Sequence, residues 1–432
     1  MQPPDTEPRI GLRFVGILAA IAVVGLVVRI VFLRAYVSTN LPFDDGLWYH
    51  GSANLLADGR GLLDPLAYVF QGRLRESAGH PPLWVFVLGS VSWFGGTSVY
   101  AHQLTQVAVA TLAVVAVGFL GREVAGDRPG LLAAALAAVY PAFWASQGDV
   151  YSESLYTLVL ALMLLVAYRF LRRPTWGTAI ALGVATALAA LCRGEALLFL
   201  PVLVLPAIVR APIGRTGRWA LLAGVGIGVV VLLAPWTIYN STRFDDPVAI
   251  TTGVGPVIAG ANCARTYRQP ELGSWNVGCS VRPLPGDESV VANGLRRAGV
   301  TYARNHLGRV PVVVAARIGR TFEVYDVNPN TRGPEWVDWL VAGAWYLLVP
   351  FAVAGAVLLR RRRVSLLPVV ATVIVVVVAV ALTWGTPRFR VPVDVVVVVL
   401  AAVAIDALLP GSGSLREHGR APEPETVVAS EG

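Results

Sequence analysis

Residues 16–50 read GILAAIAVVGLVVRIVFLRAYVSTNLPFDDGLWYH. The part up to Val37 is an apolar run long enough to cross a bilayer, whose hydrocarbon core of about 30 Å needs about 20 helical residues. No small-residue cleavage site follows it, so we expect a retained span rather than a cleaved signal peptide. Just beyond it lie two adjacent carboxylates, Asp44 and Asp45. Because charges this close to a bilayer are costly to dehydrate, the pair is a candidate functional site.

The rest of the chain is as apolar as its start. Hydrophobic residues make up 55% of the 432 and charged residues only 14%, whereas a soluble protein carries about 25% charged residues. The sequence therefore predicts an all-α polytopic membrane protein. Ten apolar runs predict membrane helices, at 14–36, 100–121, 130–147, 152–170, 175–192, 195–210, 219–238, 335–358, 365–384 and 391–409.

Charge supports a membrane environment rather than a nucleic-acid partner. The net charge of +8 comes entirely from arginine, since the chain has no lysine, and arginines near a bilayer set topology or meet lipid phosphate. The chain has no phosphate-binding Gly-Lys-Ser/Thr loop, no HExxH and no nucleophile elbow. Nucleotide hydrolysis and zinc proteolysis therefore lack support.

The run from Pro82 to Gly95 decides the topology. Its 14 residues reach only about 21 Å at about 1.5 Å each, too short to cross. If it does not span, the arginine-rich short loops all face the cytoplasm, as the positive-inside rule requires. They contain Arg122, Arg128, Arg169, Arg172, Arg173, Arg210, Arg215, Arg218 and Arg360 to Arg363. We therefore expect an interfacial or re-entrant helix at the outer face.

This topology predicts five regions along the chain. They are a cytoplasmic tail (1–13), a membrane module containing the first outer loop 37–99 (14–238), an extracytoplasmic loop domain (239–334), further membrane helices (335–409) and a disordered cytoplasmic tail (410–432). The loop domain contains Cys263 and Cys279. An exported compartment permits a disulfide between them, which would add about 3 kcal/mol in the chain-entropy model; the alternative is two free thiols.

The residues able to do chemistry gather in the predicted outer loops. One carboxylate of the Asp44–Asp45 pair can accept a proton from a hydroxyl nucleophile while the other holds a metal or orients the acceptor. Alternatively, the pair caps the helix that follows. His80, before Pro81-Pro82, is either a site residue or a polar residue at the interface.

Glu153 follows Ser152 at the start of a predicted span. It is a site carboxylate, a metal ligand or an arginine partner, or else Ser152 caps the helix and Glu153 meets its dipole. Arg193 and Glu195 share a very short outer turn. An arginine there opposes the positive-inside rule, so it needs either a salt bridge with Glu195 or an anionic ligand.

Arg388 and Arg390 raise the same question in the last outer turn, TPRFRVP (386–392). Guanidinium groups bind phosphate through two parallel hydrogen bonds. The alternative is that these side chains reach toward lipid headgroups. We favour a ligand for both, because they lie on the same predicted side of the membrane as the carboxylates.

Taken together, these segments resemble the GT-C superfamily of integral-membrane glycosyltransferases, in particular the bacterial relatives of protein O-mannosyltransferases and lipid A aminoarabinose transferases, of actinobacterial type. The matching pieces are Asp44-Asp45, AGHPPL (78–83), SESLY (152–156), RGE (193–195), APW (234–236), the loop from Ala261 to Cys279, and RFRVP (388–392).

The resemblance implies a GT-C fold of about ten transmembrane helices with an interfacial helix in the first outer loop and a larger extracytoplasmic loop. It implies an inverting transferase in the plasma (inner) membrane that moves a sugar from a polyprenyl-phosphate carrier to a protein, glycan or lipid acceptor outside. Asp44 would be the general base beside Asp45, and a divalent metal is possible. The alternative is a transporter or flippase of a lipid-linked sugar, which would favour inverted repeats and polar residues deep in the spans.

Overall fold

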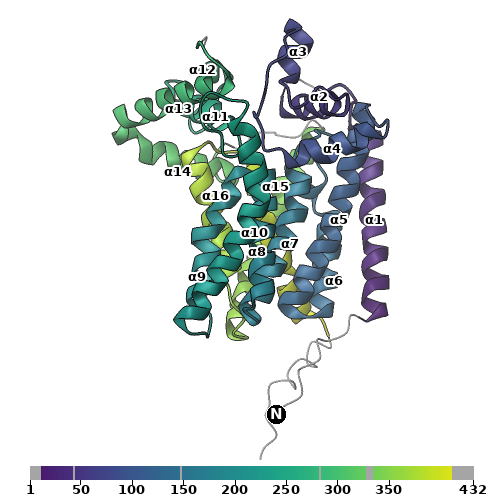
Figure 1. Ribbon diagram of the computed structural model, residues 1–432. Coiled ribbons are helices and arrows are strands. Elements are labelled where there is room, and N and C mark those ends of the chain that lie inside the picture. The colour runs from purple at the N-terminus through teal and green to yellow at the C-terminus, as the bar shows by residue number, and fades with distance from the viewer. Residues whose placement is uncertain (1–10, 42–43, 146–147, 282–283, 327–333, 411–432) are drawn as a thin grey trace, which may run out of the picture.

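The computed structural model describes residues 11–41, 44–145, 148–281, 284–326 and 334–410. Most of the predicted N-terminal and C-terminal tails lie outside these ranges. Within them the fold is helical, with an isolated β-bridge between Leu63 and Glu76. A bundle of roughly parallel helices occupies one part of the molecule, and shorter helices cover one of its ends (Figure 1).

Each of the ten predicted runs corresponds to a helix or helical segment of the bundle. Six are long and apolar enough to cross a membrane: α1 (Leu12–Tyr36), α5 (Val99–Ala125), α7 (Glu153–Arg172), α10 (Arg215–Ser241), α15 (Glu335–Arg361) and α17 (Val391–Leu408) with the short turn before it. The others are shorter: α6 (Asp127–Val139), α8 (Trp176–Cys192), α16 (Leu367–Leu382) and the segment 194–209, which ends in α9 (Leu205–Val209).

The predicted helix over 130–147 is wrong at its end. Helix α6 stops at Val139, and a short turn, η1 (Pro141–Phe143), follows it. The residue before a proline avoids the helical region, and Tyr140 is extended, with φ −64° and ψ 119°. The buried guanidinium of Arg29 on α1 donates to the carbonyl of Ala138 at 2.9 Å and to that of Ala137 at 3.2 Å. An arginine inside a membrane helix thus satisfies the carbonyls that end its neighbour.

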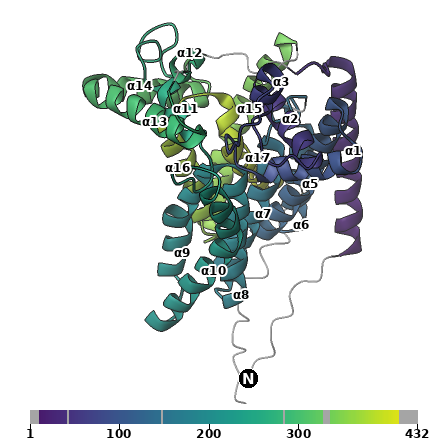
Figure 2. The same cartoon turned by 45° about the horizontal axis from the view of Figure 1, so that its top comes forward.

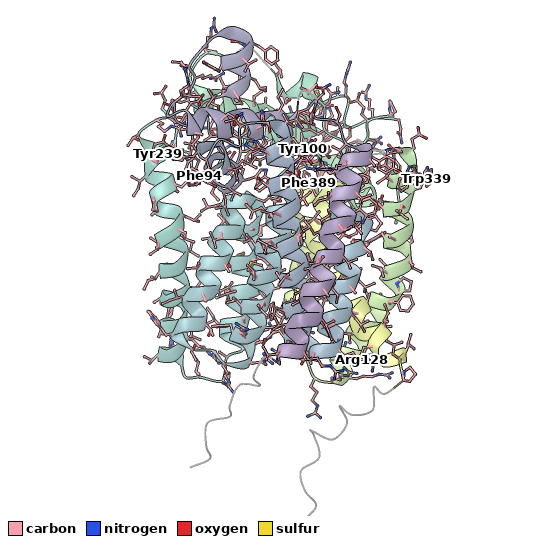
Figure 3. The ribbon with its side chains drawn as sticks, turned by 90° about the vertical axis from the view of Figure 1, so that its right-hand side faces the viewer. Phe94, Tyr100, Arg128, Tyr239, Trp339 and Phe389 are labelled. Atoms are coloured by element: carbon pink, nitrogen blue, oxygen red, sulfur yellow. A yellow bond between two sulfur atoms is a disulfide. The ribbon has the colours of Figure 1, made fainter. Side chains whose placement is uncertain are left out.

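The arginine-rich turns lie together at the end of the bundle away from the short helices. Helix α1 runs from that end to the covered end, and α5 runs back (Figure 1). Helix α4 (Leu83–Trp93), the segment predicted not to span, instead lies across the covered end near α2 (Asp45–Ala57). Phe94, Tyr239 and Trp339, exposed by 89%, 42% and 71%, lie at one level near this end, with Arg128 at the other (Figure 3). Such a girdle is typical of a membrane–water interface.

The covered end carries two groups of helices. Helices α2 and α3 (Pro65–Gln71) come from the first long loop, and α3 rises above the rest (Figure 1). Helices α11 (Val254–Ala261), α12 (Val277–Ser280), α13 (Glu288–Asn305) and α14 (Val310–Thr321) come from the second, and the last two project sideways as a hairpin in both views (Figures 1 and 2). The predicted disulfide between Cys263 and Cys279 is confirmed and ties α12 to the chain after α11.

Candidate functional site

Four segments distant in the sequence meet at the covered end of the bundle. They are the start of α2, the chain entering α7, the turn after α8, and η5 (Pro387–Arg390), the turn before α17. They bring together five of the predicted site residues in one set of ion pairs, namely Asp45, Glu153, Arg193, Glu195 and Arg388, and the imidazole of His80, from the loop before α4, completes the set beside Asp45. We call this set the ion-pair cluster.

Asp44 caps α2 and also faces the cluster. Its Oδ1 accepts a hydrogen bond from the backbone N–H of Gly46 at 2.9 Å, and its Oδ2 accepts one from the hydroxyl of Tyr151 at 2.6 Å. A Cβ on Gly46 would lie 2.0 Å from the carbonyl oxygen of Asp149, so only glycine lets α2 approach that segment so closely. The capping role is confirmed, and it aims the carboxylate pair at the chain that enters α7.

The chain that enters α7, which faces the start of α2, has a strained backbone at Val150. Val150 has φ 56°, a region that β-branched residues rarely adopt. The side chain of Gln106 accepts a hydrogen bond from its N–H at 3.0 Å, and the indole of Trp84 donates to its carbonyl at 2.8 Å. Such strain persists only where the surroundings enforce it, and it often marks functional sites. Here it sets the direction of Tyr151, which sequence analysis had not selected.

Asp45 pairs with a guanidinium. Arg388 Nη2 donates to its Oδ2 at 2.8 Å, and Nε2 of His80 lies 3.6 Å from its Oδ1. Burial by itself raises the pKa of Asp45, but the positive charge of Arg388, with a smaller contribution from His80, outweighs that effect and lowers the pKa to about 2. Asp45 is therefore an anion at any physiological pH.

His80 is enclosed by aromatic rings and a braced loop. The rings of Trp48 and Tyr49 lie 4.7 Å and 4.8 Å from its own, centroid to centroid. Burial lowers the pKa of His80, so the imidazole is neutral at pH 7. The loop before it is fixed by the hydroxyl of Thr251, which donates to the carbonyls of residues 78 and 79, both at 2.8 Å. His80 is thus a positioned, uncharged member of the cluster.

Glu153 lies at the centre of the cluster. It is only 4% exposed, and its Oε1 accepts hydrogen bonds from Arg193 Nη1 at 2.7 Å and from Arg388 Nε. The predicted arginine-partner role is therefore confirmed, whereas Ser152 makes no side-chain cap. The other oxygen, Oε2, is buried and has no hydrogen-bond partner among the described residues. Glu153 also lines a small cavity of about 10 Å³ between α5, η1, α7 and α17, so the cavity adjoins the cluster.

Arg193 and Arg388 are further fixed by neighbours. Arg193 Nε donates to Glu195 at 2.6 Å, which confirms the predicted salt bridge, and its guanidinium lies 4.7 Å from the ring of Phe389. The guanidinium of Arg388 lies 3.9 Å from the ring of Tyr151. Stacking on aromatic rings orients both forks while leaving them largely shielded from water.

Arg390 does not join the ion-pair cluster. It is 1% exposed and donates to Glu323 and, at 3.2 Å, to Asp394. Asp394 also accepts a hydrogen bond from the hydroxyl of Tyr140 at 2.9 Å. Two arginines of one turn therefore face different networks, and the Arg390 network links the end of α14 to α17 and η1. Sequence analysis had selected neither carboxylate partner.

Few of the described side chains in the cluster are placed to bind a metal ion. Among the described residues, no three His, Cys, Asp or Glu side chains are arranged so as to hold one. Asp45 and His80 offer two ligands, while the bonded oxygen of Glu153 is taken by guanidinium groups. The described residues therefore do not form a three-ligand metal site.

Comparison with known proteins agrees with the predicted resemblance. Residues 79–239, less than half of the chain, match the family described as dolichyl-phosphate-mannose-protein mannosyltransferase. No curated protein matches the chain significantly.

Solved structures of an archaeal oligosaccharyltransferase share this architecture. Archaeal oligosaccharyltransferase AglB from Archaeoglobus fulgidus, with an inhibitory peptide and a dolichol-phosphate, matches with a TM-score of 0.58 and 14% identity, over 92% of this chain and 50% of that one. The oligosaccharyltransferase of the same organism with Zn and sulfate gives 0.56 and 16%, over 91% and 49%. ArnT from Cupriavidus metallidurans bound to undecaprenyl phosphate gives 0.41 and 18%, over 92% and 78%.

The chain thus spans about half the length of the oligosaccharyltransferases that it matches. At these identities the likeness shows the fold alone. The predicted GT-C fold and the resemblance to GT-C membrane glycosyltransferases are confirmed.

Proposed function

We propose that this chain is an inverting glycosyltransferase that moves a sugar from a polyprenyl-phosphate carrier to an acceptor at the extracytoplasmic face of the plasma (inner) membrane. The observation that carries the proposal is the ion-pair cluster. It places two guanidinium groups and the Asp44–Asp45 pair at one end of a membrane bundle. The opposite end carries the arginine-rich turns, which by the positive-inside rule face the cytoplasm.

Displacement at an anomeric carbon needs a base for the acceptor hydroxyl and cations for the departing phosphate. We assign the base to Asp44. Asp45 is tied to Arg388, and its pKa of about 2 makes it a poor proton acceptor near neutral pH. Asp44 instead accepts hydrogen bonds from the neutral donors Gly46 N–H and Tyr151 O–H. Before the donor binds, Asp45 serves to orient Arg388.

We assign the phosphate to Arg193 and Arg388. Glu153 holds both guanidinium groups through one oxygen, with Glu195 and Asp45 as the outer partners. Arg390 takes no part in this step, since its bonds go to Glu323 and Asp394. The membrane module 14–238 would supply the base and Arg193, and the C-terminal helices 335–409 would supply Arg388. The loop domain 239–334 would brace the His80 segment.

The alternative is a transporter or flippase of a lipid-linked sugar. Charges deep in a bundle mark the pathways of such proteins. The ion-pair cluster lies instead at one end, and the buried Arg29 is used to satisfy the carbonyls that end α6. This placement favours the enzyme.

The test uses the full chain in liposomes with a panel of polyprenyl-phosphate sugars and a crude cell-envelope acceptor. Release of polyprenyl phosphate is followed for the wild type, Asp44→Asn and Asp45→Asn. We expect release from one donor, abolished in Asp44→Asn and reduced in Asp45→Asn. Movement of intact lipid-linked sugar between leaflets, without release, would contradict the proposal and favour the flippase.

A further inference from the structure

The hairpin of α13 and α14 is anchored at the end of a membrane helix. Arg317 on α14 donates through Nη1 to the carbonyl of Ala381, near the end of α16, at 2.8 Å. A Cβ on Gly385 would lie 2.1 Å from the carbonyl oxygen of Arg317. The C-terminal part of α14 is therefore packed at the height where α16 leaves the bundle.

From this anchor the hairpin extends away from the bundle. Helix α14 runs outward beside the upper end of α16, and the turn between α13 and α14 is its outermost part in both views (Figures 1 and 2). The eight residues from Val310 to Arg317 correspond to about 12 Å at about 1.5 Å per residue. The tip of the hairpin, 304–309, therefore lies more than this length of helix away from the anchor at Arg317.

The inner and outer faces of α14 differ. Val313 and Ala316 are buried against Tyr267 and Leu272 and form the core of the hairpin. The other face leaves Pro311, Val312 and Ala315 exposed, and Val312 is 45% exposed. The spacing of three and four residues places these side chains on one stripe. Leu307, in the short turn η4 (Leu307–Arg309) that precedes α14, adds an apolar side chain at the tip and is 67% exposed.

The height of the exposed α14 stripe along the bundle indicates that lipid covers it. The girdle of Phe94, Tyr239 and Trp339 marks the membrane boundary near the covered end of the bundle (Figure 3), and α14 joins α16 at that end. Exposed Arg304 and Arg309 flank Leu307, where guanidinium groups would meet lipid phosphates. An apolar stripe flanked by arginines at the interface is the pattern of a helix that lies in the membrane surface.

We propose that the α13–α14 hairpin is a membrane-surface anchor, with Leu307 and the exposed stripe of α14 inserted at the boundary between lipid headgroups and acyl chains. The hairpin would then attach the disulfide-bonded loop domain to the bilayer beside the bundle. This inference is independent of the proposed enzymatic function.

The test places one nitroxide label at a time in the full chain, reconstituted in vesicles of phosphatidylethanolamine and phosphatidylglycerol. Cys192 is buried and Cys263 is bonded to Cys279, so an introduced cysteine is the reactive one. Leu307→Cys is compared with Val69→Cys on α3, which is equally exposed at 69% but rises away from the girdle (Figure 1). Phe94→Cys reports the girdle itself.

We expect the ratio of oxygen to nickel-complex collisions at residue 307 to be severalfold higher than at residue 69 and close to that at residue 94. Val312→Cys provides a second position on the stripe and should behave like Leu307→Cys. A ratio at both positions equal to that at residue 69 would place the hairpin in water and overturn the proposal. Labels that are immobile and shielded from both reagents would show a protein contact, such as a second copy, and would overturn it as well.

Discussion

Replacing Glu153 with glutamine should destabilise the protein more than the same replacement of either other carboxylate in the ion-pair cluster. Glu153 is 4% exposed, and one of its oxygens accepts from both Arg193 and Arg388. Glutamine has nearly the same shape, so the substitution removes the charge without creating a cavity. Each guanidinium group would keep one carboxylate, Arg193 with Glu195 and Arg388 with Asp45, but both would lose the buried anion that they share.

The magnitude follows from the number of bonds and the burial. Removing one partner of a buried ion pair costs about 3–5 kcal/mol. The amide oxygen of glutamine keeps both acceptor contacts, and two such hydrogen bonds restore about 1–2 kcal/mol. We therefore expect the free energy of unfolding to fall by about 1–4 kcal/mol.

Glu195→Gln is the matched control, since it removes the same charge from a carboxylate that pairs with Arg193 alone and is 31% exposed. Pairs this close to solvent contribute about 1 kcal/mol or less. Both variants can be compared by equilibrium unfolding in mixed micelles with increasing dodecyl sulfate. Equal losses for the two variants, or no loss for Glu153→Gln, would refute the central role of Glu153.

Three further predictions follow from the site and the loop domain. The pKa of Asp45 is lowered to about 2. The ionised carboxylate therefore contributes its full stabilisation above about pH 5 and loses it as the pH falls through about 4 toward about 2. The difference in unfolding free energy between the wild type and Asp45→Asn should shrink over that range. Gly46→Ala would place a Cβ 2.0 Å from the backbone carbonyl oxygen of Asp149, so it should lower the unfolding free energy by about 2 kcal/mol or more and reduce turnover. The control is Gly16→Ala, whose added Cβ would have no atom of another residue within 4 Å and should cause neither effect. The double variant Cys263→Ser/Cys279→Ser should lower the stability of the loop domain by about 3 kcal/mol, measured as faster proteolysis of 254–325; an unchanged rate would contradict the stabilising role.

The bundle could be predicted from the sequence because hydropathy and arginine placement act over whole segments. The short run at 82–95 was correctly predicted not to span, since length alone excludes it. The end of α6 was missed although Pro141 signals it. The apolar run continues past that proline, and hydropathy does not distinguish a helix from the extended turn that follows. The role of Arg29 was also not predictable, because its partners Ala137 and Ala138 contribute only backbone carbonyls.

The site could be predicted at the level of residue type and membrane side, but not of partner. Arg388 and Arg390 are separated by one residue and have the same chemistry. They occupy a 3₁₀ turn, which has about three residues per turn, so side chains two positions apart point in different directions. One meets Asp45 and Glu153, and the other meets Glu323 and Asp394. Only the packing of η5 between two networks decides which arginine faces the carboxylate pair.

The charge balance of the cluster has a consequence for the proposed reaction. Asp45, Glu153 and Glu195 carry three negative charges against the two positive charges of Arg193 and Arg388. A donor phosphate adds further negative charge, so its binding favours the displacement of one carboxylate from these guanidinium groups. Glu153 is held by both arginines with its side chain 5% exposed, whereas the side chain of Asp45 is 36% exposed and pairs with Arg388 alone among them. Desolvation and bond number thus favour Asp45 as the carboxylate that yields, with Glu153 as the fixed anchor. Donor binding would then free Asp45 beside Asp44 at the moment when the acceptor hydroxyl needs both a base and an orienting group.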